Sequence, residues 1–128
     1  MFEQDYVMRL IHEMVRTLIM LLFQRDIRDD EEIIFSKEAK ELTELLRRLV
    51  DEGRIEEAEN LLVEEMEDGN HMNFEAALMF YEYVNRKDNE FLESNHFSRK
   101  EIAEGIGYAA RNYGYESIVE PLLDDIPE

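Results

Sequence analysis

His12 and the acidic stretch EEMEDGNHMN are the two places where this sequence could bind a metal ion. A zinc-binding helix commonly carries two histidines four residues apart, but the residue four positions after His12 is Arg16. The acidic stretch groups Glu64, Asp68 and His71, yet its glycine directly follows Asp68 and does not occupy the sixth position of a calcium loop. We therefore predict no metal site, and the acidic stretch is expected to be a solvated helix end.

The sequence lacks the other common signatures of catalysis. It contains no cysteine, which excludes thiolate nucleophiles, and it contains no glycine-rich phosphate loop. The 32 Asp and Glu residues are so numerous that chance carboxylate pairs say nothing about acid–base catalysis. We predict a non-enzymatic protein with no catalytic residue and no cofactor. The alternative is a small enzyme or divalent-metal-binding protein that uses the acidic surface from Glu64 to His71, with Asn70 or the tyrosines.

The composition predicts a globular and strongly acidic protein. Its 128 residues are 45% hydrophobic and 36% charged, which is too apolar for a disordered chain and too charged for a membrane protein. The net charge of −18 repels phosphate backbones and anionic lipids, so we expect neither nucleic acid nor a membrane as a partner. Glu3 and Asp5 stand where a secretory signal would carry basic residues, and we expect a cytoplasmic location.

The scarcity of glycine and proline indicates an all-α fold. With 5 glycines, 2 prolines and no β-branched alternation, the chain is expected to form about six helices in a single domain over 1–128. The expected segments are a long apolar-faced helix within 1–28, a first helical hairpin over 36–69, an aromatic helix over 73–87 and a second hairpin over 98–126. The long helix itself should run from Phe2 to Ile27, and RKDNEFLESN should be a loop with one short helical turn.

Several helix boundaries have local signals. The segment FSRKEI has the capping-box spacing at Ser98 and Glu101 and the hydrophobic-staple spacing at Phe97 and Ile102, which predicts a helix start at Ser98. Elsewhere the sequence predicts N-caps at Ser36 and Asn73 and helix ends at Gly53, Gly69 and Gly114.

Arg99 and Lys100 follow the predicted cap at Ser98 directly. The helix macrodipole disfavours cations in a first turn by about 0.3–1 kcal/mol at an exposed site. Either the surrounding acidic residues compensate for this cost, or the two cations meet an acidic partner.

Two segments of the sequence align without gaps at an offset of 61 residues. The alignment of LLRRLVDEGRIEEAENLL with IGYAARNYGYESIVEPLL pairs Gly53 with Gly114, and each copy predicts a helical hairpin that reverses at its glycine. The small and apolar positions of both hairpins resemble those of tetratricopeptide repeats: Leu42, Leu45, Leu49, Gly53, Ala58 and Leu62, and then Ala103, Ile106, Gly107, Ala110, Gly114, Val119 and Leu123. This resemblance implies stacked hairpins, although the offset differs from the ~34-residue tandem period.

A second resemblance covers nearly the whole chain. The segments MFEQDYVMRLI, GRIEEAENLL, FYEYVNRKDNEFLESNHFSR and YGYESI resemble a family of small, uncharacterised bacterial all-helical proteins. The resemblance implies a small bacterial protein in the cytoplasm and supplies no functional residues.

The first helix carries an unusually wide apolar arc. At ~100° per residue its apolar side chains span roughly 180°, which is more than one neighbouring helix covers. The opposite face holds Arg9, His12, Glu13 and Arg16. Acidic and basic residues cancel up to Arg28, so the whole net negative charge lies later in the chain.

Three interpretations of this arc are open: burial by the chain's own hairpins, a homodimer contact between two such helices, and membrane-surface binding, which the charge disfavours. We favour a combination in which Met8, Val15 and Ile19 face the core and the remaining side meets a second copy or another protein. The predicted interaction residues are Leu10, Met14, Leu18, Leu21 and Leu22.

The sequence as a whole predicts a non-catalytic protein–protein interaction or oligomerisation module whose partner is a protein, with a homodimer expected. A further possibility is an acidic groove that receives a basic peptide. The aromatic residues of the predicted fourth and fifth helices are expected to fill the core.

Overall fold

The computed structural model describes residues 2–23, 37–67, 71–124 and 126. These residues form seven helices and no strand, which confirms the all-α prediction. The helices are α1 (Phe2–Phe23), α2 (Lys37–Asp51), α3 (Ile55–Met66), α4 (His71–Asn85), α5 (Asn89–Ser94), α6 (Arg99–Asn112) and α7 (Glu116–Leu123). The short helix α5 lies where a single helical turn was predicted, and it accounts for the difference from six.

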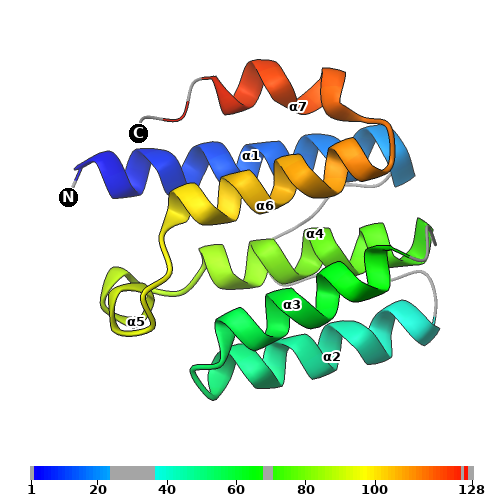
Figure 1. Cartoon of the computed structure of the whole chain (residues 1–128). Helices are drawn as coiled ribbons and strands as arrows, with labels where there is room; N and C mark the ends of the chain where they lie inside the picture. The colour runs from blue at the N-terminus through cyan, green and yellow to red at the C-terminus, as the bar shows by residue number, and fades with distance from the viewer. Residues whose placement is uncertain (1, 24–36, 68–70, 125, 127–128) are drawn as a thin grey trace.

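Helix α4 is the centre of the fold. It packs against α1, α2, α3 and α6 (Figure 1). Its residues from Phe74 to Asn85 are all buried except Tyr83, which is half-buried. A helix that is apolar on all sides is stable only when neighbours surround it, and this segment has no polar face. The prediction of an aromatic core is confirmed for Phe74, Phe80 and Tyr81 and is wrong for Tyr108, which is exposed on α6.

Apart from the short α5, the helices form two groups of three, and α4 links the two groups. Helices α2, α3 and α4 pack against one another, and so do α1, α6 and α7. Figure 1 shows α4 between the α2–α3 hairpin and the α6–α7 hairpin. Each hairpin is therefore completed by a third helix, and direct tetratricopeptide-like stacking of one hairpin on the other stays a prediction.

Both predicted glycine turns have the same backbone geometry. Gly53 has a φ of 78° and Gly114 a φ of 84°, in the left-handed region where glycine has no steric cost. Each turn has the two hydrogen bonds of a Schellman motif. These bonds are Arg54 N–H to Leu49 O and Gly53 N–H to Val50 O in the first turn, and Tyr115 N–H to Ala110 O and Gly114 N–H to Arg111 O in the second. The predicted reversal at each glycine is confirmed.

The predicted helix boundaries are confirmed in part. Ser98 caps α6 through a complete capping box with Glu101, as predicted. Asn73 is not an N-cap, because α4 already begins at His71 and Asn73 lies inside the helix. The predicted cap at Ser36, the stop at Gly69 and the end of the first helix beyond Phe23 lie outside the described residues.

None of the helices in the described part of the chain combines the length and the apolar character that are needed to cross a bilayer.

Candidate functional site

The predicted interaction surface on α1 is only partly exposed. Met14 and Leu18 are completely buried within the chain, so they cannot contribute to an outer surface. Leu10 is half-buried, Leu21 is 59% exposed, and the side chain of Leu22 lies outside the described residues. Met14 and Leu18 are buried because α4, α6 and α7 all pack against α1, and three neighbours cover a wider arc than the predicted inward-facing side.

The exposed Tyr6 and Leu21 nevertheless lie along one line of α1, together with Leu10 and Thr17. Tyr6 is 46% exposed, and Thr17 is half-buried like Leu10. On a helical projection Tyr6, Leu10, Thr17 and Leu21 fall within about 60° of one another. We call these four residues the outer strip of α1. Met20, which is 44% exposed, lies beside it.

The outer strip belongs to the electrically neutral part of the chain. The exposed Glu13 and the half-buried Arg16 of the same helix form an ion pair with 3.7 Å between Oε2 and Nη1. All of the net charge of −18 lies after Arg28, so the segment that carries the outer strip adds little to the repulsion between two acidic molecules.

A buried carboxylate joins α1 to α4 on another side of α1. Oε2 of Glu82 lies 2.5 Å from Nδ1 of His12 and accepts a hydrogen bond from Nε of Arg86 at 3.2 Å. Oε1 of Glu82 is buried and has no hydrogen-bond partner among the described residues. The imidazole of His12 on α1 thus contacts a carboxylate of α4.

Arg99 is buried, which corrects the prediction that it could meet an acidic partner. Its guanidinium donates to Oδ1 of Asn85 at 3.2 Å and to the carbonyl oxygens of Asn85 and Lys87 at 3.1 and 2.7 Å, and it also bonds to Asn89. Burial lowers the pKa of this guanidinium. Asn85 in turn donates to the carbonyl of Met8, so one arginine and one asparagine join α1, α4, α5 and α6.

Tyr81 forms a second buried polar contact, between α4 and α3. Its hydroxyl donates to Oε2 of Glu59 at 2.7 Å, and burial raises the pKa of both groups. The ring of Tyr81 fits against α6 because residue 105 is glycine, since a Cβ there would lie 2.3 Å from the ring. The contact joins α3 to α4, with Tyr81 buried and Glu59 half-buried.

The alternative metal site receives no support from the described residues. Within that part of the chain no group of three or more His, Asp or Glu side chains is arranged to hold a metal ion. Residues 68–70 and the side chain of His71 lie outside the described residues, so the full predicted cluster is not tested.

Sequence reasoning missed the buried polar residues of α4. A usable signal was present: Glu82 stands in a largely apolar segment, and a carboxylate in such a helix must find a partner inside the protein. The identity of the partner, His12, depends on the rotation of α1, which the sequence does not specify.

The sequence model of a family described as a family of unknown function (DUF6483) matches residues 1–114. No curated protein matches the chain, and no solved structure does.

Proposed function

Because the chain belongs to this family of unknown function, no activity can be transferred to it, and we propose a function from its surface. We propose that the protein is a non-catalytic interaction module that associates with a second copy of itself through the outer strip of α1. The observation that carries the proposal is the exposure of Tyr6 and Leu21 along one line of a helix whose other apolar side chains are largely buried.

The low net charge of α1 is compatible with a contact between two copies. Two copies that each carry a net charge of −18 repel one another, and the repulsion is smallest where the contacting segments are neutral. A two-fold axis brings the same surface of both copies together, so a self-complementary apolar strip is covered in one step. Burial of apolar area contributes about 25 cal/mol per Å2 before the entropy cost of association.

Two further parts of the proposal, the arrangement of the hairpins and the cellular location, are based on the sequence resemblances. We propose that the two hairpins, with α4 between them, form a tetratricopeptide-like stack and that the protein acts in the bacterial cytoplasm. The identical Schellman turns at Gly53 and Gly114 support the first point. The resemblance to small bacterial helical proteins supports the second.

Size-exclusion chromatography with light scattering tests the proposal. The expected mass of the wild-type protein at high concentration is twice the chain mass of 15.3 kDa. Leu21→Asp places a charge on the most exposed leucine of the proposed contact and should give a folded monomer. Leu45→Asp is the matched control, because Leu45 is an exposed leucine on α2, outside the strip. A wild-type monomer at every concentration, or a dimer that Leu21→Asp leaves intact, would overturn the proposal.

Metal analysis separates the proposal from its rival. The alternative of a divalent-metal-binding protein predicts one tightly bound ion per purified chain and a rise in melting temperature with that ion. The interaction module predicts neither.

A further inference from the structure

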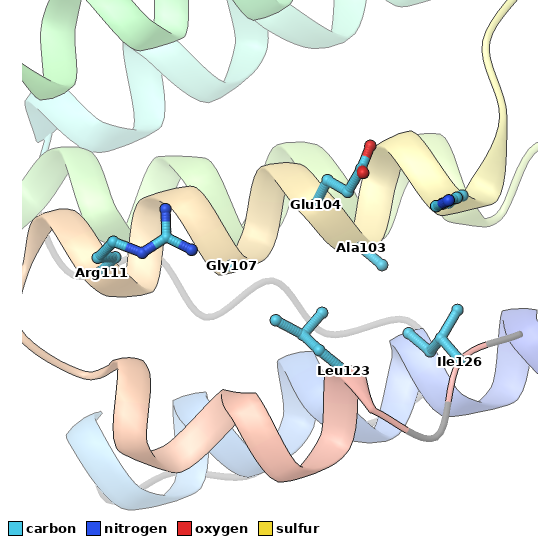
Figure 2. Close-up of a pocket in the computed structure, with 7 residues that line it drawn as sticks. Ala103, Glu104, Gly107, Arg111, Leu123 and Ile126 are labelled. Atoms are coloured by element: carbon cyan, nitrogen blue, oxygen red, sulfur yellow. The ribbon is translucent and has the colours of Figure 1, made fainter. Parts of the chain in front are cut away.

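A pocket lies between α6 and the end of α7, on residues that the outer strip does not include. Its volume is about 350 Å3, at the small end of the range for sites that bind small molecules. Figure 2 shows Leu123 and Ile126 pointing toward α6 and Ala103 pointing toward them. These three side chains form the apolar part of the lining.

Gly107 shapes this pocket. A Cβ at position 107 would lie 2.9 Å from Cδ1 of Leu123, closer than such contacts occur. The glycine therefore allows α7 to approach α6 at this point, because position 107 adds no side chain to the pocket.

Two cations lie at opposite ends of the pocket. Lys100 is in the first turn of α6 and Arg111 in its last turn, about 16 Å apart along the helix axis. Figure 2 shows the guanidinium of Arg111 extended along α6 in the direction of Gly107. Within the described part of the chain neither cation forms an ion pair or hydrogen bond. Lys100 also stands where the macrodipole disfavours a cation.

The one carboxylate of the lining, that of Glu104, does not neutralise these cations. Figure 2 shows it directed away from Leu123 and Ile126. Its charge acts on the other side of α6, where it contributes to the raised pKa of Glu59 on α3. The pocket thus offers two available positive charges in a chain whose net charge is −18.

We propose that this pocket binds a small organic dianion whose two acidic groups flank an apolar chain, such as a straight-chain dicarboxylate. One carboxylate pairs with Lys100 and the other with Arg111, and the methylene chain lies against Ala103, Leu123 and Ile126. A compact inorganic anion leaves the apolar lining without a contact, and a monocarboxylate leaves one cation without a counter-ion.

Calorimetric titration of the full chain with suberate and sebacate tests the proposal, with octanoate, decanoate and inorganic phosphate as comparison probes. The dicarboxylates should bind saturably, and the monocarboxylates should bind about fivefold more weakly because one ion pair is lost. Phosphate should bind more weakly still. Added salt should weaken dicarboxylate binding, since surface charge pairs are screened. Equal affinity for the mono- and dicarboxylates, or no saturable dicarboxylate binding, would overturn the proposal.

Charge-neutralising variants identify the site. Lys100→Gln and Arg111→Gln should each weaken suberate binding about fivefold. Arg48→Gln is the matched control, because Arg48 is an exposed cation in the last turn of α2 and does not line the pocket. Circular dichroism verifies that each variant is folded. If Arg48→Gln weakened binding as much as the two pocket variants, the effect would be one of net charge and the assigned site would be wrong.

Discussion

At the scale of single residues, buried polar side chains hold the helices of this protein in place. Arg99 provides the clearest case, since its guanidinium satisfies the side chain of Asn85 and the carbonyl oxygens of Asn85 and Lys87. These oxygens lie where the chain leaves α4 and approaches α6, so water does not replace the lost donor easily.

Arg99→Met should therefore destabilise the protein. The substitution keeps much of the apolar volume but leaves the acceptors without donors, and the expected loss is about 3 kcal/mol in the free energy of unfolding. Urea denaturation followed by circular dichroism measures it. Lys100→Met, at the next position on the exposed side of α6, is the control and should change the free energy by less than about 0.5 kcal/mol. Equal stabilities of the two variants would contradict the structural role of Arg99.

The pH dependence of stability reports on Glu59. Burial raises the pKa of its carboxyl in the folded state above the ordinary value of 4.5, although the hydroxyl of Tyr81 partly opposes this. Below the ordinary pKa the carboxyl is protonated in both states and has no effect. As the pH rises above it, the ionised form is penalised in the folded state and stability is lost.

Glu59→Gln removes this penalty and keeps an oxygen for Tyr81. Its stability relative to wild type should increase from about pH 4 to pH 7, as measured by thermal unfolding at a series of pH values. Glu64→Gln, an exposed carboxylate on the same helix, controls for the general relief of acidic repulsion and should show a smaller increase. Parallel curves for the two variants would mean that Glu59 is solvated like Glu64.

At the scale of helices, the two glycine turns are equivalent in their backbone but not in their surroundings. A Cβ on Gly114 would meet no other atom within 4 Å, whereas a Cβ on Gly53 would lie 2.8 Å from Oδ1 of Asn95. Gly114→Ala should cost about 1 kcal/mol from the left-handed conformation alone, and Gly53→Ala should cost about 2 kcal/mol. Chemical denaturation measures the free energy of unfolding of both variants.

A double variant tests the contact with Asn95. Adding Asn95→Ala to Gly53→Ala should reduce the loss of stability to that of Gly114→Ala, and failure of this rescue would show that the contact with Asn95 is unimportant.

The sequence predicted those helices whose boundaries are encoded locally. The cap at Ser98 and the stops at Gly53 and Gly114 depend on residues within one turn, so they could be identified without a fold. The cap at Asn73 was wrong because the helix begins two residues earlier, at His71. The inward direction of Arg99 could not be predicted, because it depends on the acceptors that α4 and the following loop present.

At the scale of the whole molecule, the central position of α4 explains how much of α1 is exposed. With α4, α6 and α7 packed on it, α1 buries Met14 and Leu18, and the outer strip and Met20 stay accessible among its described apolar positions. The width of the apolar arc was evident in the sequence, but the number of helices that cover it depends on the packing of distant segments. The pocket between α6 and α7 was missed for the same reason, since Lys100 and Arg111 share a site only once Leu123 lies opposite them.

Disulfide cross-linking tests most directly whether two outer strips meet in solution, because the chain has no cysteine and an introduced thiol has no competitor. A contact between strips predicts rapid covalent dimers on mild oxidation, either from Leu21→Cys alone if the helices are parallel, or from a mixture of Tyr6→Cys and Leu21→Cys chains if they are antiparallel. Leu45→Cys on α2 should stay monomeric under the same conditions. If the α1 variants formed no more cross-linked dimer than Leu45→Cys in either arrangement, the outer strip would not be the contact surface.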